Sequence, residues 1–326
     1  MTRKRREIIA ANEISELMTY SLGGYNQKVL IEGRYRTNPI VIFLHGGPGF
    51  PIPFCAGCRG MFPDLTERFI MVYWDQLGCG INNCRIDDSF SVDSYVTMTV
   101  ELVQKIKEEF PENPINLLGV SWGSVLAAKT AIQLPEIIAK VMTYGQVLKQ
   151  LTFNEEVYQV LESTKLPGKQ RRQLEHIKSI DKHSVKELKA VMQWVQKYTE
   201  GYQSKAGGKA PMGAILYGLL TSPDYSFRDL KAIVINGYRK NLSLLRELMD
   251  IDLSEELHHI QVPYRILQGD TDIVTSTKMI REFSKKANNN HITFQWIPKS
   301  GHTPGSVAMD YIMKDGLDYL DSRIAD

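Results

Sequence analysis

The sequence predicts an α/β fold in which a mostly parallel sheet, covered by helices on both faces, is interrupted by an all-helical insertion. Short apolar runs with little alternation recur along the chain, as in strands that are buried on both faces. Amphipathic helical patterns separate these runs, and such alternation is typical of α/β proteins. Between about Gln146 and His259 helical patterns follow one another without a convincing strand, which indicates the insertion.

The predicted elements begin with an antiparallel pair near Ile14–Tyr20 and Lys28–Ile31, with Gly23-Gly24 as the turn. The later apolar runs predict six further strands: Ile40–Leu44, Phe69–Trp74, Ile115–Leu118, Ile138–Met142, Tyr264–Leu267 and Ile292–Trp296. Apolar spacing of three and four residues predicts the main helices, which are Ser91–Phe110, Trp122–Leu134, Ser276–Lys286 and Val307–Leu320.

The length allows two domains, or one large domain with an insertion. The chain has 326 residues. Its strand and helix patterns divide it into a first core part over 1–145, a helical cap over 146–259 and a second core part over 260–326. Lys165–Lys209 in the cap carries 11 Lys and Arg against 4 Asp and Glu. This surplus indicates either a solvated helix face or a surface that recruits an anionic partner.

Composition excludes several classes of protein. The 39 Lys and Arg nearly balance the 37 Asp and Glu, so there is no electrostatic case for a nucleic-acid partner. No apolar stretch approaches the roughly 18 residues that cross a bilayer, and the basic start lacks the apolar region of a signal peptide. Four Cys make no disulfide framework. The sequence therefore predicts a cytoplasmic protein without a nucleic-acid or membrane partner, and its oligomeric state stays open.

Ser121 is the candidate nucleophile. It lies in Gly119-Val120-Ser121-Trp122-Gly123, directly between a predicted strand and a predicted helix. A sharp strand-to-helix turn needs small residues on both sides of the serine, and it raises the serine Oγ above the strand end. The N-terminus of the following helix also stabilises negative charge nearby. The alternative is a serine that caps an ordinary helix.

His45-Gly46-Gly47-Pro48-Gly49 is the candidate oxyanion loop, because its glycines let backbone N–H groups approach a ligand closely. We expect the developing oxyanion to be bound by the Trp122 amide and by the amide of Gly46 or of Gly47. The sequence does not choose between the two glycines. His45 precedes the nucleophile in the chain, and we expect it to shape the loop.

A serine nucleophile needs a base, and the base needs a carboxylate to orient it. His302 is the preferred base, because it follows the strand that ends near Trp296, whereas His291 begins that strand. Asp272 is the preferred acid in the loop after Tyr264–Leu267, because it stands at the G-x-x-D spacing common in such a loop. Asp270 would then hold the turn.

Five segments together resemble one known family: HGGPG at His45–Gly49, WDQLGCG at Trp74–Gly80, GVSWGS at Gly119–Ser124, QGDTDIV at Gln268–Val274 and SGHTP at Ser300–Pro304. They resemble the α/β-hydrolase superfamily and, within it, the proline iminopeptidase-like branch. This resemblance implies an eight-stranded core, a cap over the site, and hydrolysis through an acyl-enzyme with no metal or other cofactor.

The resemblance also implies an aminopeptidase that acts on small peptides or amino-acid amides. The chain departs from the family at Leu77, where an arginine is usual, and at Val195, where a Glu often follows the Trp. A carboxylesterase, lactonase or amidase acting on another small molecule is an alternative, and a catalytically silent binding module is a distant one. Candidate substrate contacts are Phe50, Phe54 and Trp74 in an acyl pocket, and Glu155 and Glu200 for a free α-amine.

Two cysteine pairs, Cys55 with Cys58 and Cys79 with Cys84, lie on loops after neighbouring predicted strands. Their spacing resembles a zinc site, and a disulfide is another alternative. We expect free thiols that line the mouth of the site, and no metal.

Overall fold

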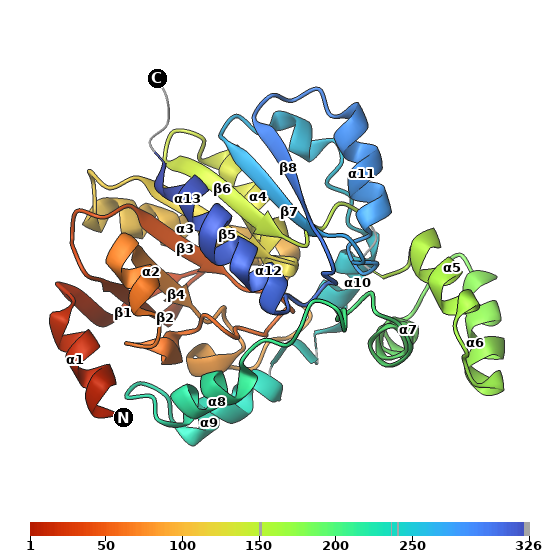
Figure 1. The fold of residues 1–326 in the computed structure, drawn as a ribbon, viewed down its shortest axis with the longest axis horizontal. Helices are drawn as coiled ribbons and strands as arrows, with labels where there is room; N and C mark the ends of the chain where they lie inside the picture. Colours follow the sequence, from red (N-terminus) through yellow and green to blue (C-terminus); the bar gives the residue numbers. More distant parts are fainter. Residues whose placement is uncertain (150–151, 236, 240, 323–326) are drawn as a thin grey trace.

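The computed structural model describes residues 1–149, 152–235, 237–239 and 241–322 (Figure 1). These residues form one eight-stranded sheet in the order β1-β2-β4-β3-β5-β6-β7-β8. The β1–β2 and β2–β4 pairs are antiparallel, and the other pairs are parallel. The predicted fold class is therefore confirmed. The strands are β1 (Ile14–Leu22), β2 (Tyr25–Gly33), β3 (Ile40–Leu44), β4 (Ile70–Trp74), β5 (Ile115–Val120), β6 (Ile138–Tyr144), β7 (Tyr264–Gly269) and β8 (Ile292–Ile297).

The opening hairpin turns at Gly23-Gly24, as predicted. Both glycines have positive φ, +60° and +78°, which glycine adopts without strain. The register pairs Leu22 with Tyr25 across the turn and Ile14 with Gly33 at the far end, so both strands are longer than the sequence pattern indicates.

Helices cover both faces of the sheet, and an apolar cluster fills the space on each side (Figure 1). On one face lie α3 (Val92–Glu109), α4 (Trp122–Gln133) and α11 (Thr277–Lys286), and on the other α2 (Pro63–Arg68), α12 (Ser306–Tyr311) and α13 (Leu317–Asp321). The helix predicted over Val307–Leu320 is interrupted by a π-helical turn, Ile312–Gly316. Gly316 packs so tightly on β6 there that an added Cβ would lie 2.7 Å from Met142 Sδ.

Between β6 and β7 the described residues form helical turns and one isolated bridge, Lys149 with Asp252. The division into 1–145, 146–259 and 260–326 stays a prediction. The elements of this insertion are α5 (Glu155–Ser163), α6 (Gly168–Lys178), α7 (Val185–Tyr198), α8 (Met212–Leu220), α9 (Phe227–Val234), η3 (Gly237–Arg239), α10 (Leu242–Asp250) and η4 (Glu256–His259).

The insertion has two lobes, which lie apart in Figure 1. Helices α5–α7 form the first lobe and pack on the loop after β7. Helices α8 and α9 form the second lobe, and their buried side packs on Cys55 and Cys58. A two-pronged ion pair holds the second lobe to the core, because the Arg59 guanidinium donates to both Asp224 oxygens at 2.7 and 2.8 Å.

An N-terminal helix that the sequence analysis did not predict, α1 (Arg3–Ala11), also contacts the second lobe. Arg5 is only 5% exposed. Its guanidinium donates to the carbonyl oxygens of Arg59, Gly218 and Gly57 at 2.5, 2.5 and 2.9 Å. One side chain thus joins α1, the loop after β3 and α8.

Among the described helices, none has the length and apolar character needed to cross a bilayer.

Replacing Arg5 by Met is expected to lower the free energy of unfolding by about 1–3 kcal/mol, because buried carbonyl oxygens lose their donors. Urea unfolding measures this change. Arg3→Met is the matched control on the same helix, since the Arg3 side chain is 89% exposed and pairs with Glu7. We expect the control to change stability by less than about 0.5 kcal/mol. Equal effects of the two substitutions would show that the buried contacts contribute nothing.

Candidate active site

The chain turns sharply at Ser121, between β5 and α4. Ser121 has φ +52° and ψ −118°, a conformation that a residue with a side chain rarely adopts. Glycines on both sides allow it. An added Cβ on Gly119 would lie 2.6 Å from the Gly123 carbonyl oxygen, and one on Gly123 would lie 1.8 Å from the Leu44 carbonyl oxygen. The predicted strand-to-helix turn is therefore present, with α4 starting directly against the end of β3.

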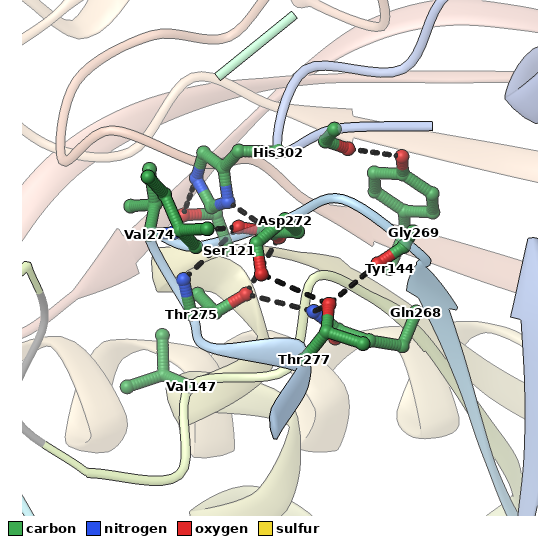
Figure 2. Close-up of polar contacts among 12 residues, drawn as sticks. Ser121, Tyr144, Val147, Gln268, Gly269, Asp272, Val274, Thr275, Thr277 and His302 are labelled. Carbon is green, nitrogen blue, oxygen red and sulfur yellow. Dashed lines mark hydrogen bonds and ion pairs between the residues drawn. The ribbon is translucent and has the colours of Figure 1, made fainter. Parts of the chain in front are cut away.

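Ser121, His302 and Asp272 form one chain of hydrogen bonds (Figure 2). Ser121 Oγ lies 2.9 Å from His302 Nε2, and His302 Nδ1 lies 3.0 Å from Asp272 Oδ2. Ser121 is 7% exposed and Asp272 is fully buried. Because a carboxylate only accepts, the proton sits on Nδ1, which leaves Nε2 to accept from the Ser121 hydroxyl. The structure thus brings the three residues chosen from the sequence into hydrogen-bonding contact.

The loop after β7 surrounds the Asp272 carboxylate with donors. Oδ1 accepts from the Val274 and Thr275 amides at 2.8 and 3.1 Å. Oδ2 accepts from the Thr275 hydroxyl at 2.7 Å in addition to His302. Hydrogen bonds from backbone amides favour the ionised form of a buried carboxyl group. The four donors also fix the orientation of the Asp272 carboxylate, so Oδ2 faces His302 Nδ1 in a fixed position.

Contacts from three directions hold the His302 loop. The Tyr144 hydroxyl donates to Gly301 O at 2.6 Å, and the Ser300 amide donates to Asp270 Oδ1 at 3.0 Å. The His302 amide donates to Gly201 O, in the segment between the two lobes, at 3.0 Å. Asp270 therefore holds the turn, as expected. The other late histidine, His291, lies just before β8, at the opposite end of that strand from the site.

His45 is fully buried in the loop after β3, and burial lowers its pKa to about 4. Its neutral ring lies 2.9 Å from Gly46 O through Nδ1 and accepts from the Gln76 amide at 3.0 Å through Nε2. Gln76 also accepts from the Trp122 indole at 2.8 Å. This network ties the loops after β3 and β4 to the first residue of α4, which gives His45 the structural role expected of it.

The oxyanion-loop residues lie beside Ser121. An added Cβ on Gly46 would come within 3.3 Å of Ser121 Cβ. Gly47 follows in the positive-φ region, at +120°. Within the described part of the chain, the Gly47 and Trp122 amides donate no hydrogen bond. These two amides are thus free to donate to a bound oxygen atom.

Two neighbouring cavities share Gln196 as a wall. The first, here called the apolar cavity, has a volume of about 290 Å³ and is lined by Gly47, Pro48, Leu188, Lys189, Met192, Gln193, Gln196, Leu245, Leu248 and Met249. The second, the polar cavity, has a volume of about 440 Å³ and is lined by Gln196, Lys197, Tyr198, Thr199, Glu200, Gln203, Ser204, Lys205, Gly208 and Lys209. The first adjoins the oxyanion loop, and the second adjoins the segment that is hydrogen-bonded to the His302 loop.

Two of the three predicted aromatic substrate contacts are wrong. Trp74 is fully buried and donates to Gln27 Oε1, so it belongs to the core. Phe54 is 4% exposed and packs edge-on against Phe43 in the core of the opposite face. Phe50 is 47% exposed and lines neither of these two cavities, so its contact with substrate stays a prediction. Aromatic residues that follow strands fill the core or face the solvent here.

The two predicted acidic contacts lie in different places. Glu155 is exposed at the start of α5, where its carboxylate accepts from Gln159, and it lines neither cavity. Its predicted contact with a free α-amine stays a prediction. Glu200 does line the polar cavity, together with Lys197, Lys205 and Lys209. It is the single acidic residue among those that line either cavity.

All four cysteines are free thiols. Cys55, Cys58 and Cys79 are buried, so the expectation that they line the mouth of the site is wrong. Cys55 Sγ lies 3.5 Å from Cys58 Sγ, and Cys79 Sγ donates to Gln76 O. Among the described residues, His, Cys, Asp and Glu side chains form no group of three that could hold a metal ion.

The residues that support the site were not predicted from the sequence. Gln76 lies inside WDQLGCG, one of the segments that carry the family resemblance, and this position could have identified it as a residue that supports the site. The apolar walls contributed by α7 and α10, such as Met192 and Leu248, left no separate signal, because helical periodicity shows that a face is buried and not what lies opposite.

The buried His45 predicts a loss of stability in mild acid. Its folded pKa of about 4 lies below the ordinary 6.5 of histidine. Between these pH values the unfolded chain binds a proton that the folded protein does not. The free energy of unfolding therefore falls as the pH drops through this window, by up to about 1.4 kcal/mol per pH unit. In His45→Gln this contribution is absent. Urea unfolding at pH 7, 6 and 5 compares the slopes, and equal slopes would contradict a neutral buried His45.

Comparison with known proteins agrees with this geometry. The model of the alpha/beta hydrolase fold family matches residues 39–305. The chain is 24% identical over 311 residues to the probable aminopeptidase YbaC of Bacillus subtilis (strain 168), a match that covers 89% of this chain and 92% of that one.

Solved structures show the same fold. The proline iminopeptidase of Mycobacterium smegmatis aligns with a TM-score of 0.62 at 14% identity, over 94% of this chain and 97% of that one. The naproxen esterase of Bacillus subtilis aligns with a TM-score of 0.59 at 12% identity, over 97% and 95%. The chain belongs to the α/β-hydrolase fold family, and its resemblance to the proline iminopeptidase-like branch is confirmed.

Proposed function

We propose that this protein is a serine hydrolase that cleaves an ester or amide bond through an acyl-enzyme on Ser121. One observation carries the proposal: a hydroxyl at a strained strand-to-helix turn is hydrogen-bonded to an imidazole, and the imidazole to a fully buried carboxylate. This is the arrangement that activates a serine for acyl transfer. Membership of a hydrolase family supports the reaction class.

The first half of the reaction forms the acyl-enzyme. His302 Nε2 takes the Ser121 proton while Oγ attacks the substrate carbonyl carbon. Asp272 stabilises the imidazolium and keeps its orientation. The carbonyl oxygen becomes negative and is bound by the free Gly47 and Trp122 amides, close to the N-terminus of α4. His302 then gives the proton to the leaving group, and the acyl group stays on Ser121.

The second half releases the acid. His302 takes a proton from water, and the resulting hydroxide attacks the ester carbon. When the intermediate collapses, His302 returns the proton to Ser121 Oγ. No step needs a metal or another cofactor.

For the substrate, two observations favour different candidates. The wall of the apolar cavity beside Gly47 contains Lys189 and no carboxylate, which favours an acyl group without a free amine, from an ester or amide. Glu200 in the polar cavity, together with the names of the relatives, favours an aminopeptidase that binds a free α-amine. Three lysines line that cavity with Glu200, and they compete with a substrate amine for the Glu200 carboxylate. Comparing 4-nitrophenyl butanoate with proline 4-nitroanilide separates the two candidates.

The proposal predicts that a fluorophosphonate probe labels the wild type and does not label Ser121→Ala. Asp272→Asn should retain the serine but lose about 10³–10⁴-fold in kcat, because the histidine loses the acceptor that fixes its tautomer. The rate is measured with whichever of the two chromogenic substrates is hydrolysed. Labelling followed by tandem mass spectrometry locates the modified residue.

Asp270→Asn is the matched control, because Asp270 is two residues away and accepts from the Ser300 amide. An amide oxygen can still accept that bond, so we expect kcat within about tenfold of the wild type. An unlabelled wild type would overturn the nucleophile assignment. Equal rates for the two Asn variants would overturn the role of Asp272.

A further inference from the structure

The second lobe of the insertion exposes large apolar side chains on two consecutive helices. The apolar face of α8 and α9 is defined by Leu216, Tyr217, Leu220, Phe227, Val234 and Ile235, which are 49% to 79% exposed. An exposed apolar patch of neighbouring side chains marks a surface that binds something else.

The opposite side of the same lobe is already packed. Ile215 and Leu219 on α8 are buried against Cys55 and Cys58, so α8 is apolar all round. A helix of this kind is normally covered on every side. The anchors from Arg5 to α8 and from Arg59 to Asp224 hold the lobe in place. The apolar side chains of this face are therefore exposed in the folded protein, and not because the lobe is loosely attached.

Cations without partners lie on α9 itself and on α1, the helix that contacts α8. Arg228 and Lys231 are on α9, and Lys231 stands at helical spacing between Phe227 and Val234. Lys4 and Arg6 are on α1, the helix that contacts α8, and Figure 1 shows the N-terminus beside α8. All four are exposed, and within the described residues their side chains form no ion pair or hydrogen bond.

The nearby acidic groups are already engaged. Asp224 is paired with Arg59, and Asp229 caps α9 by accepting from Ser226. Glu7 is paired with Arg3 on α1. Asp229 still carries a negative charge, because its partners are neutral. The surface therefore combines exposed apolar side chains with four exposed cations and one such acid, which leaves a positive surplus.

We propose that the apolar face of α8 and α9, with Lys4, Arg6, Arg228 and Lys231, docks this protein onto an anionic lipid bilayer. Apolar side chains enter the boundary between headgroups and acyl chains, while nearby Lys and Arg bind the negative lipid headgroups. This is surface binding, so it needs no membrane-spanning helix. The sequence predicted no membrane partner, because it contains no apolar stretch long enough to cross a bilayer. Binding at the bilayer surface needs no such stretch.

Charge also argues against a second copy of the chain as the occupant. A two-fold dimer brings the same patch of each copy together. The cations of one copy would then meet those of the other, and two of the three nearby acids, Asp224 and Glu7, already pair with arginines. An anionic bilayer offers acyl chains to the exposed apolar side chains and negative headgroups to the cations.

The test is co-sedimentation of the full chain with lipid vesicles. We expect binding to vesicles of mixed phosphatidylcholine and phosphatidylglycerol, and much weaker binding to phosphatidylcholine alone. Raising NaCl from about 0.05 M to about 0.5 M should weaken binding, because it screens the charges. This readout is independent of the proposed hydrolase activity, so either proposal can fail without the other.

Two variants test the two components. The triple change Leu216→Ser, Leu220→Ser and Phe227→Ser should weaken binding about tenfold or more. Arg228→Glu with Lys231→Glu should weaken binding to anionic vesicles about 25-fold or more, because each lost cation costs about fivefold. The replaced side chains are exposed, and thermal unfolding followed by circular dichroism checks that each variant folds.

Lys182→Glu with Lys186→Glu is the matched control, because it makes the same charge change at exposed positions of the other lobe. We expect this control to bind like the wild type. The proposal is overturned if the wild type stays in the supernatant with anionic vesicles, or if the control weakens binding as much as the Arg228/Lys231 variant. It is also overturned if the triple variant only dissociates a dimer, seen by size-exclusion chromatography with light scattering.

Discussion

The close approach of α4 to the end of β3 is the constraint on which the site depends. A single added carbon on Gly123 would lie 1.8 Å from the Leu44 carbonyl oxygen. Because β3 and β5 are neighbouring parallel strands, this contact sets the turn at Ser121 beside the loop that starts at His45. Ser121 therefore lies beside Gly46 in that loop, where an added Cβ would come within 3.3 Å of Ser121 Cβ. The strain at Ser121, with φ +52°, is offset by packing around it.

The other half of the site depends on a buried carboxylate whose position is fully determined. Asp272 accepts four hydrogen bonds, three of them from its own loop. The adjacent strand brings His302 to the same edge of the sheet, and Tyr144, at the end of β6, holds its loop through Gly301. Carboxyl ends of parallel strands thus supply every part of the proposed machinery.

Much of the core was predictable, because buried parallel strands leave continuous apolar runs and the site residues sit at their ends. Ser121, Asp272 and His302 each lie in a short segment with glycine nearby, so local sequence locates them. What was not predictable depends on tertiary contacts. Arg5 looks like a solvated cation in α1 until the carbonyl groups around it are known. Trp74 could face a pocket or the core, and sequence does not distinguish the two.

The insertion was the least predictable part. Helical periodicity predicts that α8 has a buried side, but it does not show that the remaining apolar side chains stay exposed. It also does not show that α7 and α10 form the wall of a cavity next to Gly47. Substrate choice and surface binding both depend on this segment, whereas the proposed chemistry depends on the core.

The most direct measurement of the central claim is the mass of the protein trapped during turnover. The enzyme is mixed with an excess of a substrate that it hydrolyses, quenched with acid within the first turnovers and digested for mass spectrometry. The account predicts an added acyl mass on the peptide that contains Ser121. An acyl group on a different residue, or hydrolysis with no acylated peptide at any quench time, would contradict it.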